Sequence, residues 1–327
     1  MGLKGDNAFA NPSNIELSED ILKAARIILD GDCVAVPTET VYGLAANAYN
    51  ENACRKIFEI KNRPFIDPLI VHVSDMAMAE SIAYFNDKAR KLAERFWPGP
   101  MTIVLKKKNV IPDLVSANLD TVAIRMPSHK IAHALIVASK VPFAAPSANP
   151  FGYVSPTKAE HVRAQLGDKI KLILEGGQCD RGLESTIISL ADPNKPLLLR
   201  FGPLSREELE AFLGEKVVVP EKNPAQPIAP GMMKSHYSPK ANFKLFENES
   251  EIPENFDGAI IFLKRPQNPK NNHFWLSEDG NLAEVAKNLY DLMRNCDKKY
   301  SKILCQKPEN SGVGAAINDR LIRASKK

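Results

Sequence analysis

The chain has 327 residues, 44% of them hydrophobic and 25% charged, which is typical of a folded globular protein and excludes a disordered one. At roughly 100–200 residues per domain, this length predicts about two domains. The net charge of +4 is too small to indicate nucleic-acid binding by itself. No apolar run approaches the roughly 20 residues that span a bilayer, and the polar segment 1–14 lacks the apolar stretch of a signal peptide. We therefore expect a cytoplasmic protein without membrane association.

The cysteines and histidines predict neither a disulfide framework nor a metal site. The five cysteines include no C-x-x-C pair, and this spacing suits a reducing compartment. One histidine pair, His129 and His133, has the spacing of a helix turn, but no H-E-x-x-H acid or third ligand lies near it. We interpret the pair as part of a helix surface or core.

The first 215 residues alternate predicted helices with short apolar strands. Helical periodicity is found over residues 18–30, 51–62, 87–96, 129–139, 158–166 and 205–213. Strand-like apolar runs occupy residues 33–37, 69–73, 101–105, 122–125, 143–145, 172–174 and 186–189, and a turn-rich segment follows the first of them at 38–44. This alternation predicts an α/β fold in which helices cover a sheet.

A proline-rich segment then divides the chain. Five prolines between residues 220 and 239 prevent a regular helix or a central strand and indicate an extended linker. Beyond it, strands at 243–246, 258–263 and 302–305 and helices at 281–296 and 315–323 have the rhythm of a small doubly wound, Rossmann-like domain. The predicted divisions are an N-terminal extension (1–17), a first domain (18–215), a linker (216–240) and a small α/β domain (241–327).

Cationic side chains stand where predicted elements end. Lys61 and Arg63 close a helix, and Pro64 and Pro68 fix an extended run that would hold both outward as a pair suited to a polyphosphate. The simpler alternative is the general preference for cations at a helix C-terminus. Arg125 ends a buried strand, and because unpaired burial of a charge is costly it needs an anionic partner, either structural or a ligand.

Hydroxyl and glycine residues gather in the turns at 37–43, 146–149 and 182–186. Such turns can bring backbone N–H groups to an anion, although each is a weak signal alone. His72 lies within an apolar strand, where a lone histidine is more often a satisfied core residue. Neither a G-x-x-x-x-G-K-[ST] phosphate loop nor a G-x-S-x-G nucleophile elbow occurs in the sequence.

Taken in order, a series of motifs resembles the threonylcarbamoyl-AMP synthase family, which has a YrdC-like fold built on a twisted mixed β-sheet. The motifs are Pro37–Leu44, Lys61-x-Arg-Pro64, Pro68–His72, Trp97–Thr102, Val122–Pro127, Pro146–Asn149, Ser155–Thr157, Glu184–Ile187 and Leu199–Gly202. Pro230–Pro239 and Gly314–Leu321 resemble the longer, two-domain branch of the family. The sequence departs from the family pattern at Ala45 and Ala46, at Phe201 and in the linker at 233–235.

The resemblance implies a nucleotidyltransferase that joins L-threonine, bicarbonate or carbon dioxide, and ATP into threonylcarbamoyl-AMP and releases pyrophosphate. This reaction is the first step of threonylcarbamoyladenosine (t6A) modification of tRNA. The resemblance also implies Mg²⁺ held through ATP oxygens, no protein metal site and no organic cofactor. The partners implied are the tRNA-modifying threonylcarbamoyl transferase machinery, with a weak tRNA contact left open.

The same resemblance assigns roles to individual residues. Those implied for threonine are Thr40, His72, Arg125, Ala145 and Ser185. Those implied for ATP are Lys61, Arg63, Asp67, Thr121, Ser147, Asn149, Ser155, Arg200, His236 and Tyr237. Lys61 and Arg63 would be the catalytic pair nearest the phosphates. Tyr237 and His236 would reach over the nucleotide from the linker, which we interpret as a lid that excludes water.

Two alternatives from other classes stay open at this point. A non-catalytic RNA-binding module would bind RNA in a salt-sensitive way, but Lys and Arg do not cluster beyond Lys106–Lys108. A carbamoyl-transfer maturation enzyme with a related domain would be expected to carry cysteine-pair zinc motifs and additional domains, which this sequence lacks.

Overall fold

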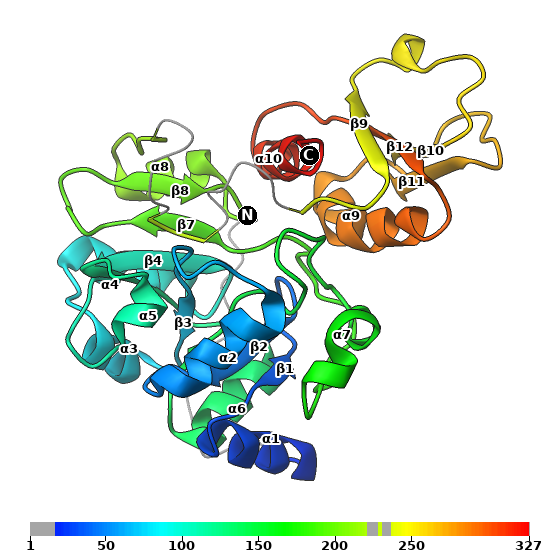
Figure 1. The fold of residues 1–327 in the computed structure, drawn as a ribbon. Coiled ribbons are helices and arrows are strands. Elements are labelled where there is room, and N and C mark those ends of the chain that lie inside the picture. The colour runs from blue at the N-terminus through cyan, green and yellow to red at the C-terminus, as the bar shows by residue number, and fades with distance from the viewer. Residues whose placement is uncertain (1–16, 221–227, 231–236, 327) are drawn as a thin grey trace.

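The structure is a computed structural model that describes residues 17–220, 228–230 and 237–326. The predicted N-terminal extension, except for Leu17, therefore falls outside the described residues, as does much of the predicted linker with His236. The described residues form two β-sheets covered by helices (Figure 1). Among these residues, no helix is both long and apolar enough to cross a membrane.

The larger sheet has eight strands in the order β1-β2-β6-β3-β5-β4-β7-β8. The strands are β1 (Val34–Val36), β2 (Gly43–Asn47), β3 (Ile70–His72), β4 (Met101–Lys106), β5 (Thr121–Arg125), β6 (Phe143–Ala144), β7 (Thr186–Ser189) and β8 (Leu197–Arg200). The pairs β3–β5 and β4–β7 are parallel and the other pairs are antiparallel. The sheet is therefore mixed, as predicted.

Helices cover this sheet unequally. They are α1 (Glu19–Leu29), α2 (Glu51–Lys61), α3 (Met76–Ile82), α4 (Asp87–Phe96), α5 (Asp113–Ser116), α6 (Lys130–Ser139), α7 (Ala159–Leu166) and α8 (Arg206–Leu213). The largest core cluster joins α2, α3, α4, α5 and α7 to one face, whereas α1 and α6 pack together near β1 and β2 on the other. Side chains alternate along β3, so that Val71 joins the main core while His72 reaches the pocket described below.

Local signals explain why several helices begin where they do. Ser18, Asn50 and Asn86 each accept a hydrogen bond from the backbone of the first turn of α1, α2 and α4, and a capping box of Ser205 with Glu208 opens α8. At the end of α2 the left-handed Asn62 (φ 56°) turns the chain.

The smaller sheet has the order β11-β10-β12-β9, and all of its pairs are parallel. It comprises β9 (Asn242–Phe246), β10 (Ala259–Lys264), β11 (His273–Ser277) and β12 (Lys302–Gln306), with helices α9 (Leu282–Asp297) and α10 (Val313–Ala324). A parallel sheet with helical connections agrees with the Rossmann-like prediction. The domain boundaries at residues 215 and 241 stay a prediction.

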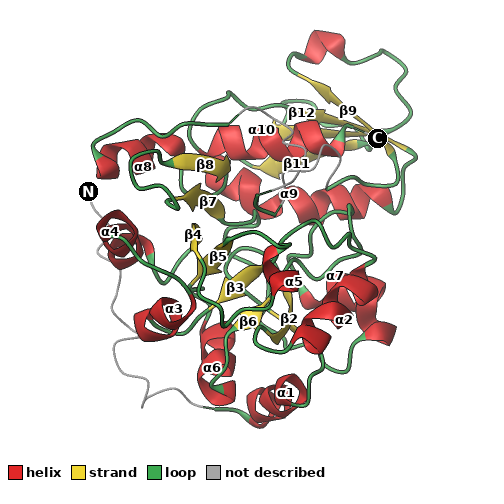
Figure 2. Cartoon of the chain, turned by 60° about the vertical axis from the view of Figure 1, so that its left-hand side comes forward, coloured by secondary structure: helices red, strands yellow, loops and turns green. Residues whose placement is uncertain are grey.

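The two sheets lie in different halves of the molecule, and α9 lies between the smaller sheet and the rest of the chain (Figures 1 and 2). One hydrophobic cluster crosses this junction, because Val41, Val154 and Leu183 pack with Leu289 and Ile317. We call the larger sheet with α1–α8 the first unit, and the smaller sheet with α9 and α10 the second unit. Removing the second unit would expose apolar surface as well as remove any lid, so single substitutions test the role of the second unit more sharply.

Most predicted elements are confirmed, but the strand predicted at 172–174 is wrong. Ile173 forms only an isolated bridge with Ala35. Only Ala35 of the three-residue β1 pairs with this segment: its N–H donates to the Leu172 carbonyl oxygen, and its carbonyl oxygen accepts from the Leu174 N–H. The sequence also gave no sign of α3, β8 or β11, and the turn predicted at 38–44 overlaps the start of β2.

The close approach of the two units at Gly182 can be tested by substitution. Its φ is +67°, and an added Cβ would lie 2.4 Å from the Ala286 carbonyl oxygen in α9. We expect Gly182→Ala to lower the free energy of unfolding by roughly 2–4 kcal/mol, combining backbone strain with overpacking. Gly214→Ala is the matched control because Gly214 has φ +70° but no atom near an added Cβ. Urea unfolding measures both, and equal losses would contradict the packing at Gly182.

Candidate active site

A pocket open to solvent lies where strands of the larger sheet begin or end. Ala145 follows β6, His72 ends β3, Arg125 ends β5, Ser185 precedes β7 and Arg200 ends β8. In the sheet order β6, β3 and β5 are neighbours, and β7 and β8 are neighbours on the other side of β4. The predicted residues that line the pocket are Thr40, Arg63, His72, Arg125, Ala145, Ser147, Ser185, Arg200 and Tyr237.

Arg125 is buried and already has an anionic partner. Its Nη2 lies 2.7 Å from Oε1 of Glu39, its Nη1 donates to Thr40 Oγ1 at 2.9 Å, and its Nε donates to the Gly99 carbonyl oxygen at 3.2 Å. Five guanidinium N–H groups exceed these three partners, so donors are left for a ligand carboxylate. Glu39 lies inside the polar turn at 37–43, yet it is not among the predicted site residues.

His72 is the register partner of Arg125 across the parallel β3–β5 pair. Burial, together with the charge of Arg125, lowers the pKa of His72 to about 3. Its Nδ1 lies 3.2 Å from the Ile70 carbonyl oxygen, and the ring also has a backbone hydrogen bond at Phe143. In the tautomer that donates from Nδ1, the other ring nitrogen is an acceptor. His72 is thus both a satisfied strand residue and a wall of the pocket.

Lys61 and Arg63 are not held outward as a pair. Lys61 is buried beneath the turn at 147–149, and its Nζ donates to the carbonyl oxygens of Ser147, at 2.5 Å, and Asn149. Burial and then the charge of Arg63 lower the Lys61 pKa well below its usual value. Arg63 does line the pocket, with its Nη2 2.9 Å from Asp67 Oδ2. The left-handed Asn62 (φ 56°) lies between the two cations and ends the helix, so Lys61 belongs to α2 and Arg63 to the loop that follows.

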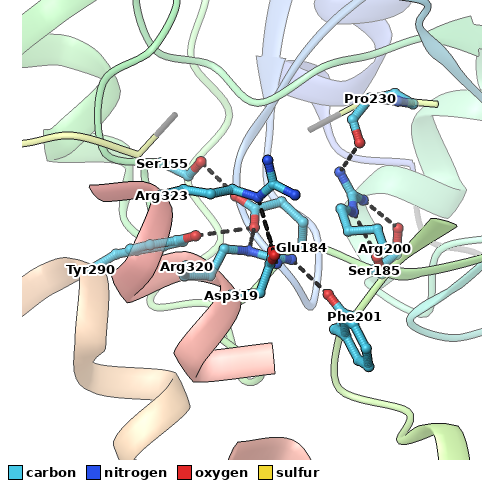
Figure 3. A network of polar contacts seen from close by, with 10 residues as sticks. All are labelled: Ser155, Glu184, Ser185, Arg200, Phe201, Pro230, Tyr290, Asp319, Arg320 and Arg323. Atoms are coloured by element: carbon cyan, nitrogen blue, oxygen red, sulfur yellow. Dashed lines mark hydrogen bonds and ion pairs between the residues drawn. The ribbon is translucent and has the colours of Figure 1, made fainter. Parts of the chain in front are cut away.

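Arg200 differs from the other pocket arginines. Its Nη2 and Nε donate to Ser185 Oγ and the Ser185 carbonyl oxygen at 2.9 and 3.0 Å, and its Nη1 donates to the Pro230 carbonyl oxygen at 3.4 Å (Figure 3). Thr102 Oγ1 lies 2.7 Å from Ser185 Oγ and supports this arrangement. Among the described residues, no carboxylate lies within ion-pair distance of Arg200, so its charge is available to an anionic ligand.

Glu184 lines the pocket and is a functional residue that the site predictions missed. It accepts hydrogen bonds from Ser155 Oγ at 2.6 Å, Arg320 Nε at 2.8 Å and Tyr290 Oη at 3.1 Å (Figure 3). Burial by itself would raise the Glu184 pKa, but Arg320, Arg200 and the Ser155 hydroxyl outweigh it and lower the pKa to about 2. The carboxylate is therefore ionised at neutral pH.

Tyr237 lies against the second unit. It is buried, adopts a left-handed backbone conformation (φ 63°) and stacks on Tyr290 with ring centroids 5.8 Å apart. The Arg320 guanidinium lies 5.0 Å from the centroid of the Tyr237 ring. Tyr237 reaches the pocket as predicted, while the neighbouring His236 lies outside the described residues.

The remaining predicted residues do not line the pocket. Asp67 is buried against Arg63, and burial raises its pKa. Thr121 begins β5, at the opposite end of the strand from Arg125. Asn149 Nδ2 donates to the carbonyl oxygens of Pro150 and Tyr153 and so braces its turn. The binding roles of these residues, and of Ser155, stay predictions.

The histidine pair and the cysteines lie within the fold of the larger and smaller units. His129 caps α6 by accepting from the Ile131 N–H at 3.2 Å, and His133 Nε2 lies 3.0 Å from the Ser74 carbonyl oxygen. All five cysteines are buried and unpaired. Within the part of the chain that the structure describes, no three His, Cys, Asp or Glu side chains gather as metal ligands.

Comparison with known proteins places the chain in a family. A model described as "Telomere recombination", for the Sua5, YciO and YrdC proteins, matches residues 26–202, and one described as "Threonylcarbamoyl-AMP synthase, C-terminal domain" matches residues 204–326. The threonylcarbamoyl-AMP synthase of Pyrococcus abyssi is 40% identical over 318 residues, which span 92% of this chain and 93% of the relative. The chain belongs to the threonylcarbamoyl-AMP synthase family. The Bacillus subtilis threonylcarbamoyl-AMP synthase is also 40% identical, with 93% and 92% of the two chains covered.

The structure agrees with this family. The crystal structure of P. abyssi Sua5 complexed with L-threonine matches with a TM-score of 0.87 at 39% identity, over 93% of this chain and 94% of that one. The predicted family, its two-unit architecture and the mixed sheet are therefore confirmed for this threonylcarbamoyl-AMP synthase family member.

The neutral state of buried His72 predicts a pH-dependent stability. Because its folded pKa is about 3, below the ordinary value of about 6.5, the unfolded chain binds a proton more readily. Stability is then fully present above pH 6.5 and declines as the pH falls toward 3. Between pH 7 and pH 5 the wild-type protein should lose about 2 kcal/mol through this residue.

Urea unfolding at the two pH values, on wild type and His72→Asn, measures this loss. The variant should lose about 2 kcal/mol less than wild type. His273→Asn is the control, because His273 lies in β11 and is only partly buried, and it should keep most of the wild-type pH dependence. Parallel curves for wild type and His72→Asn would show that His72 is not held neutral.

Proposed function

We propose that this protein synthesises threonylcarbamoyl-AMP from L-threonine, bicarbonate or carbon dioxide, and ATP, and releases pyrophosphate, as the first step of t6A formation. The observation that carries the proposal is the row of strand ends that brings Arg125, His72 and Arg200 to one pocket. Separated cations, with no activated nucleophile among the described lining residues, suit a reaction between substrates that supply their own nucleophiles. The threonine complex of the P. abyssi relative supports threonine as a substrate.

In the proposed reaction the threonine amine attacks the carbon of bicarbonate or carbon dioxide to form a carbamate. A carbamate oxygen then attacks the α-phosphorus of ATP, and the bond from that phosphorus to the bridging oxygen breaks to release pyrophosphate. Starting from bicarbonate, water leaves; starting from carbon dioxide, a proton leaves. The protein mainly fixes the geometry, an effect that can supply roughly 7–11 kcal/mol.

Each end of the pocket has a distinct role. The unused N–H groups of Arg125 bind the threonine carboxylate, and the neutral Nε2 of His72 accepts a hydrogen bond from the amino acid. Arg200 and Arg63 bind the ATP phosphates, and Lys61 holds the Ser147 turn against the nucleotide through its carbonyl contacts. Tyr237 covers the nucleotide from the linker side.

The donor set of the pocket fits Mg²⁺ carried by ATP. Among the described residues that line the pocket, Glu184 has the one carboxylate that could bind a metal ion directly. Its oxygens already accept three hydrogen bonds. We therefore assign Mg²⁺ to the phosphate oxygens, which satisfies its preference for oxygen ligands. Bound there, it neutralises phosphate charge, and no organic cofactor takes part.

The product passes to the tRNA-modifying transferase machinery, in the cytoplasm. A weak RNA contact is part of the proposal, but the Lys106–Lys108 run is partly engaged within the chain. Lys107 forms an ion pair with Asp113, and Lys108 donates to the Glu80 carbonyl oxygen at 2.6 Å. We therefore expect any RNA contact to be weaker than substrate binding.

The first test is pyrophosphate release from Mg²⁺-ATP by purified protein. Release should need both L-threonine and bicarbonate, and L-serine should support it far less. Folded protein that releases pyrophosphate without threonine, or none with all substrates present, would contradict the proposed function. Salt-sensitive RNA binding in place of turnover would instead favour the RNA-binding alternative.

Arg125→Lys tests the threonine end of the pocket. Lysine keeps the charge but loses the planar fork, so the KM for threonine should rise roughly 10–100-fold with a smaller change in the KM for ATP. Steady-state pyrophosphate assays measure both constants. Arg163→Lys is the control because Arg163 is exposed and pairs with Glu175 at the surface. An unchanged threonine KM would sink the role given to Arg125.

Arg63→Ala tests the phosphate end and should abolish adenylate formation, a loss of at least about 100-fold in rate. Removing Arg63 also leaves Asp67 buried without its cation, which is destabilising. The double variant Arg63→Ala, Asp67→Asn removes that unpaired charge and should fold while staying inactive. Thermal unfolding checks the fold, and an active, folded double variant would exclude Arg63 from phosphate binding.

A further inference from the structure

The wall of the pocket at Glu184 depends on the second unit. Of the three hydrogen bonds to this carboxylate, one comes from Ser155 and two come from Tyr290 in α9 and Arg320 in α10 (Figure 3). Tyr290 and Arg320 are separated from Glu184 by more than a hundred residues of chain. A side chain of the first unit that lines the site is thus fixed by helices of the second.

Arg320 is the centre of this contact. It is fully buried and does not itself line the pocket. Its Nη1 pairs with Asp319 at 2.9 Å, its Nη2 donates to the Phe201 carbonyl oxygen at 2.9 Å, and its guanidinium lies over the Tyr237 ring. The Arg320 side chain therefore contacts Glu184 in the pocket wall, Phe201 next to Arg200, and Tyr237.

The charges around Glu184 show what Arg320 prevents. The ionisable groups that act on this carboxylate are Arg320 from α10, Tyr290 from α9, Arg200 from β8, and Tyr237, while Asp319 from α10 pairs with Arg320. Arg200 is close enough for its charge to act on Glu184, yet it bonds to Ser185 and has no carboxylate partner among the described residues. Without Arg320, the buried Glu184 carboxylate would attract Arg200, which is the other cation that acts on it.

We propose that Arg320 is a positioning residue for the nucleotide side of the active site: by pairing with Glu184 it keeps Arg200 free for the ATP phosphates and holds Tyr237 over the pocket. This inference rests on the proposed function, and it makes the second unit part of the active-site scaffold. If Arg320 only joined the two units, its substitution would lower stability and would not change the KM for ATP and the KM for threonine to different extents.

The test compares Arg320→Gln, Arg320→Lys and wild type by pyrophosphate release. Arg320→Gln should raise the KM for ATP by roughly tenfold or more and the KM for threonine by less than about threefold. Arg320→Lys keeps the charge and should recover part of the loss. Arg265→Gln is the matched control, since Arg265 lies in the second unit but pairs with Glu278 at its surface, and its constants should equal those of wild type.

A pH profile separates positioning from a purely structural role. Without Arg320 the ionised Glu184 carboxylate competes with ATP for Arg200, so the activity deficit of Arg320→Gln relative to wild type should be largest near pH 8 and should shrink toward pH 6 as Glu184 takes up a proton. Adding Glu184→Gln to that variant should remove the extra pH dependence. Equal rises in both KM values, or a lower Tm with unchanged constants and pH profile, would overturn the inference.

Two further measurements keep the result interpretable. Tyr290→Phe removes one hydrogen bond to Glu184 with little change of shape, and should shift the ATP KM in the same direction by a smaller factor even if Arg320→Gln folds poorly. Calorimetry of ATP binding reports on the inference without turnover. If wild type binds ATP but releases no pyrophosphate, the proposed function fails, and an unchanged ATP Kd in Arg320→Gln would separately overturn the role of Arg320.

Discussion

The burial of one carboxylate, Glu184, constrains the rest of this structure. Taking an ionised carboxylate out of water costs several kcal/mol unless strong donors replace the water, and among the described residues of the first unit only Ser155 donates to it directly. The remaining donors come from α9 and α10. The position of the second unit is therefore tied to Glu184, and the same helices contact Tyr237, which stacks on Tyr290 and has the Arg320 guanidinium 5.0 Å from its ring centroid.

The same rule explains how several arginines can share one small region. Arg125 is paired with Glu39, Arg63 with Asp67 and Arg320 with Glu184, so that mutual repulsion is largely cancelled by local carboxylates. Arg200 is the exception among the described pocket residues, because hydroxyl and carbonyl oxygens hold it in place. A preorganised cation without its own counter-ion is where an anionic ligand gains most, since no existing ion pair has to be broken.

The features of this arrangement that depend on short stretches of sequence could be predicted. Apolar runs ending in a polar residue identified β3 and β5, and with them His72 and Arg125 as candidates, and the ordered motifs identified the family. The pairings that neutralise the site were not readable, because Glu39 and Arg125, or Glu184 and Arg320, lie 86 and 136 residues apart and no local period links them. Short elements such as β8 and β11 were missed for a related reason: they become strands through neighbours in the sheet, and not through their own alternation.

Lys61 illustrates how burial changes the meaning of a motif. As a charged residue at a helix end beside Arg63, it suggested a second phosphate ligand, yet its Nζ spans two carbonyl oxygens of the turn at 147–149. Burial lowers the pKa of Lys61, and because its Nζ is engaged by two carbonyl oxygens and does not line the pocket, Lys61 braces the turn and does not face the ligand. The cationic character of the nucleotide side then falls to Arg63 and Arg200, and only Arg200 is uncompensated. Arg200 therefore stays available to an anionic ligand only while Arg320 pairs with Glu184. Through this ion pair, ligand binding in the first unit depends on α10 near the end of the chain.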